Sequence, residues 1–183
     1  METNLSRFSS RSKQGGFTFL ELVVVITIIS VLGVVALNRY YKLLVDVERT
    51  SMEHDLGVMR SAISMQFAGY YVAGNLAGLG KLVDSNPMDL LAETPNNYLG
   101  VISHYQIEDI EKGSWFYDSK EQTLIYLVRN QLYFETELTE PQRARFKIYP
   151  IYSDRVKGGV KAKSISGLTL KAIEPYRWLR PWG

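Results

Sequence analysis

The chain has 183 residues, enough for one globular domain besides a membrane segment, and it contains no cysteine. The domain therefore has no disulfide, no thiolate chemistry and no cysteine-ligated metal site. The formal charge is +2, and residues 1–16 account for all of it, because they contain one acidic residue and three basic ones, Arg7, Arg11 and Lys13. The rest of the chain is neutral, so the basic isoelectric point does not indicate nucleic-acid binding.

The apolar run at residues 17–37 is the most distinctive stretch, because Glu21 is its only formally charged residue. As a helix rising about 1.5 Å per residue, the run spans about 30 Å, the thickness of the hydrocarbon core of a bilayer. We therefore predict a transmembrane segment. A carboxylate in this position costs about 2–3 kcal/mol unless it finds a partner, so Glu21 is a candidate functional residue.

The start of this run resembles the class III signal sequence of type IV prepilins and of the pseudopilins of type II secretion. The basic leader ends at Gly16, and Phe17, Thr18, Leu20 and Glu21 follow in the order of that motif. The resemblance implies that prepilin peptidase cuts on the cytoplasmic side, between Gly16 and Phe17, and N-methylates the new terminal Phe17. It covers only the N-terminal part of the chain.

Cleavage at this position gives Glu21 a partner. The free α-amino group of Phe17 lies four residues before Glu21, and between staggered parallel helices the carboxylate of one subunit can meet the amine of its neighbour. Such pairing recovers much of the cost of burying the carboxylate. We therefore expect Glu21 and Phe17 to set the register of a multi-helix assembly. The alternative is a simple signal anchor whose Glu21 reaches the lipid headgroups.

Charge predicts the orientation, and composition predicts the domain plan. The leader residues Arg7, Arg11 and Lys13 hold the N-terminus in the cytoplasm, which places the C-terminal domain in the periplasm. We expect a removed leader, the transmembrane half of a long helix, its amphipathic periplasmic half and a globular domain, at residues 1–16, 17–37, 38–71 and 72–183.

The amphipathic pattern at residues 38–71 continues the helix beyond the membrane. Apolar residues recur there at spacings of three and four over much of the stretch, namely Leu44, Val47, Leu56, Met59, Ile63 and Phe67. No proline interrupts residues 18–71, so we predict one continuous helix of about 54 residues, about 80 Å long. Its second half should cover a sheet, with these side chains in an ordinary core.

The connection after the helix, about residues 72–101, contains several glycines and two turn signals, Asn86-Pro87 and Pro95-Asn96-Asn97. A short helix is predicted at residues 87–91. By position, the connection corresponds to the αβ-loop that varies between pilin-like proteins, and it is a candidate contact surface.

The second half of the chain is rich in aromatic and β-branched residues, which is typical of strands. We predict a hairpin whose strands lie at residues 115–117 and 124–128 around a longer loop, and turns at 158–159 and 164–167. Further strands are predicted at residues 132–134, 146–152 and 168–173. The predicted fold is α+β and pilin-like: one long helix packed on an antiparallel sheet of four or five strands.

No pattern in the sequence predicts catalysis, a cofactor or a metal. His54 and His104 have no second ligand at metal spacing, and no phosphate-binding, dinucleotide-binding or serine-hydrolase motif occurs. Calcium needs six to eight converging oxygens, and no acidic loop in the C-terminal third supplies them. We expect a protein that is not an enzyme.

The C-terminal residues 176–183 contain three aromatics and two arginines, with lysines nearby in the sequence. This composition is found in protein interfaces and in platforms that stack single-stranded nucleic acid. A tail that packs on the edge of the sheet is the simpler interpretation.

The residues together predict a structural subunit of a type IV pilus or type II secretion pseudopilus. The missing disulfide favours a minor pilin or pseudopilin over a major pilin. The expected partners are prepilin peptidase, other pilin or pseudopilin subunits, the inner-membrane assembly platform and the lipid bilayer, and nucleic acid is not an expected one. The alternatives are a competence pilin that binds DNA for uptake and a signal-anchored periplasmic domain of another function.

Overall fold

The computed structural model describes residues 16–157 and 160–181, which belong to two compact units, Met1–Tyr41 and Lys42–Gly183. The predicted leader residues Arg7, Arg11 and Lys13 lie outside the described residues.

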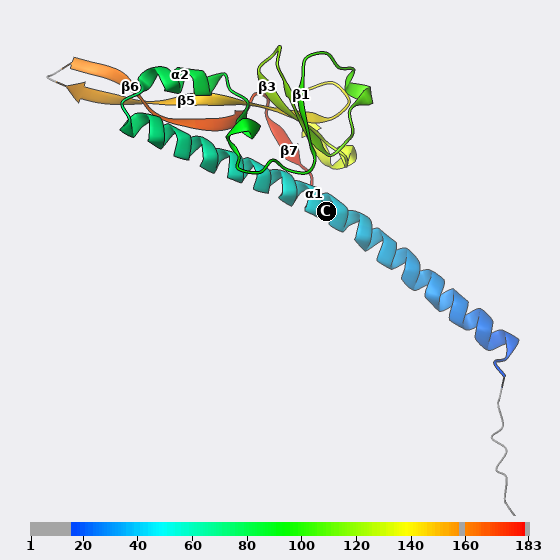
Figure 1. The fold of residues 1–183 in the computed structure, drawn as a ribbon. Helices are drawn as coiled ribbons and strands as arrows, with labels where there is room; N and C mark the ends of the chain where they lie inside the picture. Colours follow the sequence, from blue (N-terminus) through cyan, green and yellow to red (C-terminus); the bar gives the residue numbers. More distant parts are fainter. Residues whose placement is uncertain (1–15, 158–159, 182–183) are drawn as a thin grey trace, which may run out of the picture. The chain divides into compact units, whose positions relative to one another are not determined.

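Helix α1, Phe19–Val72, has 54 residues and confirms the predicted continuous helix (Figure 1). Its N-terminus is capped by Thr18, whose hydroxyl oxygen accepts a hydrogen bond from the backbone N–H of Glu21 at 3.2 Å. Among the described residues, α1 is the one helix long and apolar enough to cross a membrane, and none of its most apolar window is buried.

Within the second unit, one stripe of α1 faces the core, and its buried residues are Val45, Met52, Leu56, Met59 and Ile63. Phe67 continues this stripe and packs against the same core. The prediction that Leu44 and Val47 belong to the core is wrong, because these side chains are 37% and 55% exposed. Each residue turns the helix by about 100°, so the two side chains point away from the stripe that begins at Val45.

The main sheet has five strands in the order β1-β2-β3-β5-β6, and the predicted α+β architecture is confirmed (Figure 1). The strands are β1 (Tyr98–Ile102), β2 (Ser114–Asp118), β3 (Thr123–Leu127), β5 (Arg143–Lys157) and β6 (Val160–Ala172). Neighbouring strands are antiparallel except β1 and β2, which are parallel. The sheet is therefore mixed rather than purely antiparallel. The crossover that a parallel pair requires is the segment 103–113, which contains the 3-10 helix η2 (Ile107–Asp109).

The predicted hairpin is confirmed as β2 and β3, in which Trp115 lies opposite Tyr126. The strand predicted at residues 132–134 is largely wrong. Its first part belongs to the 3-10 helix η3 (Gln131–Tyr133), where the backbone N–H of Tyr133 donates to the Asn130 carbonyl at 3.0 Å. Strand β4 (Phe134–Thr136) begins only after this turn and pairs with β7 (Tyr176–Trp178) in a second, two-stranded sheet.

The turn predicted at residues 164–167 is also wrong, because these residues lie inside β6 and pair with Ile151–Ser153 of β5. An irregularity between Ile151 and Tyr152 absorbs one extra residue of β6 at this point. The polar and small residues at this point continue the pairing of β5 with β6 instead of ending it. The turn predicted at 158–159 lies outside the described residues.

The connection between α1 and the sheet holds two short helices, α2 (Leu76–Val83) and the 3-10 helix η1 (Pro87–Leu90). The helix predicted at residues 87–91 is therefore present as a single 3-10 turn, whereas α2 was not predicted because its glycines weaken the helical signal. Its cap is Asn75, whose side-chain oxygen accepts from the Gly78 N–H at 3.0 Å. Leu79 and Leu82 of α2 join the buried core of the second unit.

Candidate assembly interface

The predicted processing site lies immediately before α1. Gly16 and Phe17 precede the helix, and the Phe17 side chain is 79% exposed. Among the described residues, a Cβ placed on Gly16 meets no atom within 4 Å. Glu21 lies in the first turn of α1, where a carboxylate interacts favourably with the helix dipole. The structure thus brings Gly16, Phe17 and Glu21 into one short stretch at the start of the helix.

The apolar part of α1 leaves almost all its side chains uncovered within the first unit. Leu20, Ile29 and Leu32, for example, are 73%, 62% and 63% exposed. A surface of this kind is stable only in lipid or against other apolar helices.

The neutral polar side chains in this part of α1 are satisfied within the helix. Thr27 donates to the Val23 carbonyl at 2.8 Å, and Ser30 donates to the Ile26 carbonyl at 2.7 Å. Hydrogen bonds of this kind are what a hydrocarbon environment requires. Glu21 therefore remains the one formal charge of residues 17–37 that needs a partner.

Glu48 binds α1 to the chain segment after β3, and no motif or spacing in the sequence predicts this role. Its carboxylate accepts from the backbone N–H groups of Arg129 and Asn130 at 2.6 and 2.9 Å, and from the Asn130 side chain at 2.6 Å. The Tyr126 hydroxyl donates to the same carboxylate at 3.2 Å. Burial, together with the Glu48 charge, raises the pKa of Tyr126, so this hydroxyl stays a donor at neutral pH.

Asp55 makes the second polar contact between α1 and the sheet. The indole N–H of Trp115, a fully buried residue, donates to the Asp55 carboxylate at 2.9 Å. Burial raises the pKa of Asp55, and the bond from Trp115 opposes this shift. The carboxylate thus satisfies a core donor at some cost to its own solvation.

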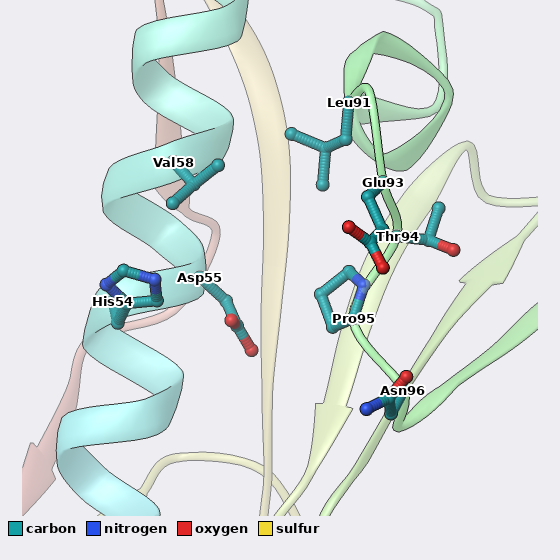
Figure 2. Close-up of a pocket in the computed structure, with 8 residues that line it drawn as sticks. All are labelled: His54, Asp55, Val58, Leu91, Glu93, Thr94, Pro95 and Asn96. Carbon is teal, nitrogen blue, oxygen red and sulfur yellow. The ribbon is translucent and has the colours of Figure 1, made fainter.

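Asp55 also lines a groove of about 270 Å³ between α1 and the segment 91–96 (Figure 2). The other lining residues are His54, Val58, Leu91, Glu93, Thr94, Pro95 and Asn96. The carboxylates of Asp55 and Glu93 both point into the groove in Figure 2. The lining contains no lysine or arginine, so the groove is anionic.

The two histidines are not brought together. His54 lies at the groove, and His104 lies in a separate loop beside Ser103. Within the part of the chain that the structure describes, no group of three or more His, Asp and Glu side chains is placed to hold a metal ion.

The two described aromatic residues of the C-terminal segment, Tyr176 and Trp178, pack against the core. The Trp178 ring meets Phe134 edge-on at 4.9 Å, and Tyr176 stacks on Phe134 at 5.4 Å. Trp178 is only 8% exposed. Arg177 is bound to Glu135 at 2.7 Å. Trp178 is therefore not available for stacking bases, and Tyr176 is stacked on Phe134.

Comparison with known proteins identifies one family model: residues 11–37 match the prokaryotic N-terminal methylation motif. Neither the curated proteins nor the solved structures contain a match to the chain. The matched stretch contains the predicted cleavage site and Glu21, and it ends where the apolar run ends. The chain therefore carries a prokaryotic N-terminal methylation motif, which supports the resemblance of its N-terminal part to type IV prepilins.

Proposed function

We propose that the chain is a minor pilin or pseudopilin, a structural subunit that assembles into a type IV pilus or a type II secretion pseudopilus. The observation that carries this proposal is the methylation motif at residues 11–37, which leads directly into a 54-residue helix with an uncovered apolar first half. A motif for processing and a helix that needs apolar neighbours are both expected of a subunit that leaves the bilayer for a filament.

In this proposal the segment 1–16 is removed by prepilin peptidase, and Phe17 is then N-methylated. The segment 17–37 holds the subunit in the inner membrane, the segment 38–71 continues the helix into the periplasm, and the segment 72–183 forms the globular domain. The leader charges Arg7, Arg11 and Lys13 retain the N-terminus in the cytoplasm. The partners are prepilin peptidase, the inner-membrane assembly platform, other pilin or pseudopilin subunits and, before assembly, the bilayer.

Glu21 has a specific role in this mechanism. Once the helices bundle and exclude water, an unpaired carboxylate is strongly disfavoured, whereas a carboxylate facing the Phe17 amine of a neighbouring subunit is compensated. Only one stagger between helices satisfies every Glu21, so the pair selects the register of the filament. The subunit has no catalytic step of its own in this account.

Replacing Glu21 by valine tests this role. We expect Glu21→Val to be cleaved at Gly16 and retained in the membrane, but to be lost from the sheared filament fraction. Glu21→Asp, which keeps the charge on a shorter side chain, serves as the control and should retain part of the assembly. Normal incorporation of Glu21→Val into filaments would rule out a role for the carboxylate in assembly.

A further inference from the structure

The outer face of the distal β5–β6 hairpin is uncovered. Strand β5 pairs with β3 only over Arg143–Phe146, and from Lys147 onward its strand partner is β6. The inner face of this two-stranded part is buried in the core through Ile148 and Leu170. We call its outer face, formed by Lys147, Tyr149, Ile151, Gly167, Thr169 and Lys171, the ribbon face.

The rest of the sheet shows what a covered outer face looks like. Over β2 and β3, the outward side chains of Phe116 and Ile125 are almost fully buried. The Tyr105 ring from the crossover segment lies edge-on against Phe116, with 4.8 Å between the ring centroids. The crossover segment thus covers the outer face over β2 and β3, whereas among the described residues Tyr149 and Ile151 of the ribbon face stay exposed.

The centre of the ribbon face is flat and apolar. Tyr149 and Ile151 are 38% and 44% exposed. The Ile151 side chain lies over Gly167, where an added Cβ would sit 3.6 Å from its Cδ1 atom. Exposed aromatic and aliphatic side chains around a residue without a side chain form a surface suited to a protein partner.

The charged end of the ribbon face is uncompensated. Lys147 and Lys171 are direct cross-strand partners, and like charges in this relation destabilise a strand pair. One step closer to the main sheet, Arg145 is paired with Glu174. Within the described residues, neither lysine forms an ion pair. An anionic partner that covers the two lysines would relieve this electrostatic repulsion.

The charge distribution of the chain indicates what that partner is. The stretch 147–171 contains six basic residues and one acidic residue, a formal charge of +5, whereas the segment 17–183 as a whole is neutral. The remainder of that segment therefore carries −5. A second copy of the chain supplies the required opposite charge, and two ribbon faces repel each other. A contact between copies must therefore join the ribbon face to a different, acidic surface.

The groove of Figure 2 has the complementary composition. Asp55 and Glu93 supply two carboxylates, and no lysine or arginine in its lining neutralises them. Val58, Leu91 and Pro95 supply apolar surface beside them. The groove thus combines acidic and apolar groups, as the ribbon face combines basic and apolar ones.

We propose that the ribbon face of one subunit docks on the groove between α1 and residues 91–96 of a second copy of this chain. Lys147 and Lys171 then face Asp55 and Glu93. The contact joins two different surfaces, and such a contact propagates as a helical filament when its rotation does not close a ring. This inference rests on the assembly proposed above and names the surfaces that the globular domains use in it.

Cysteine cross-linking tests this contact directly, because the chain contains no cysteine of its own. Two full-length copies with different tags are co-expressed, one carrying Thr169→Cys on the ribbon face and the other Thr94→Cys at the groove. Mild oxidation should produce a disulfide-linked pair that carries both tags, because a disulfide forms only when the two Cα atoms approach to about 7 Å or less. Replacing Thr94→Cys by Ser119→Cys, in the exposed β2–β3 loop, is the matched control and should give no pair.

Charge reversal then tests the complementarity. Lys147→Glu with Lys171→Glu in the ribbon copy should reduce the cross-link to the level of the Ser119→Cys control, and adding Glu93→Lys to the groove copy should restore it. Unchanged thermal unfolding of the reversed variants shows that the fold persists. A cross-link that ignores the charges, or one from position 169 to another protein in place of the groove copy, overturns the proposal.

The same samples separate this proposal from the function on which it depends. If the subunit begins at Phe17 and is present in filaments but positions 169 and 94 do not cross-link, the docking is wrong and the assembly function stands. If the subunit keeps its leader and is absent from filaments, both proposals fail.

Discussion

The burial of Asp55 predicts that the stability of the fold depends on pH. The pKa of this carboxyl is raised by burial, so between the ordinary value of 3.8 and the raised value the folded chain binds more protons than the unfolded chain. The free energy of unfolding therefore falls as pH rises through this window. Asp55→Asn keeps an oxygen for the Trp115 indole but carries no charge. In this variant the fall in the free energy of unfolding with rising pH should therefore be absent.

We expect Asp55→Asn to be more stable than the wild type at pH 7, by an amount that grows from pH 4 and levels off above the raised pKa. Thermal unfolding of the detergent-solubilised full chain at a series of pH values measures the difference. Asp55→Ala is the control: it also removes the charge but leaves the buried Trp115 donor without an acceptor, so it should be about 1–3 kcal/mol less stable than Asp55→Asn at every pH. An Asn variant whose stability follows the wild type at all pH values contradicts this account.

Single residues differ in how far the sequence reveals their roles. Gly16, Phe17 and Glu21 belong to a short motif, so their candidate roles could be predicted. Glu48 and Asp55 lie in a helix whose charged residues alternate with apolar ones, and their partners are 60 to 82 residues away in the chain. A contact of that range leaves no local pattern, so both residues were missed.

The elements of the fold show the same contrast between local and distant causes. Helix α1 was predicted almost to the residue because its apolar pattern and the absence of proline are local properties. The parallel pairing of β1 and the length of the β5–β6 hairpin depend on which strands meet, which the sequence pattern does not encode. The short helix α2 was missed because glycines reduce helix propensity, yet Gly78 is needed for packing.

The packing of helix α2 against α1 can be tested at Gly78. A Cβ at this position would lie 2.5 Å from ring carbons of Tyr70 on α1, so α2 approaches α1 there more closely than any side chain permits. Gly78→Ala should lower the free energy of unfolding by about 1–3 kcal/mol through overpacking. Gly80 lies two residues further along the same helix and has no atom within 4 Å of an added Cβ.

Gly80→Ala is therefore the matched control, and it should raise the stability by about 0.5–1 kcal/mol because alanine favours the helix. Urea unfolding of the two variants compares them directly. Equal effects of the two substitutions would show that the contact between Gly78 and Tyr70 does not determine how α2 packs.

At the scale of the whole molecule, apolar surface and charge are both left for partners to satisfy. The apolar half of α1 is uncovered, and the positive charge of the β5–β6 hairpin is balanced only by the rest of the chain. Helix bundling would cover the apolar half of α1. The proposed contact between ribbon face and groove would pair the positive charge of the hairpin with acidic residues of a neighbour. The two contacts involve different parts of the subunit, so the helix can set the register while the globular domains add selectivity between neighbours.

The central claim is that the chain is made as a prepilin and processed at the boundary between Gly16 and Phe17. Intact mass and N-terminal sequencing of the protein isolated from membranes test it most directly, with Gly16→Asp measured beside the wild type. The wild type should begin at an N-methylated Phe17, and Gly16→Asp should keep the full leader. A wild-type protein that retains Met1 or its immediate neighbour as the N-terminus contradicts the account and leaves a signal-anchored domain that is not a pilin-like subunit.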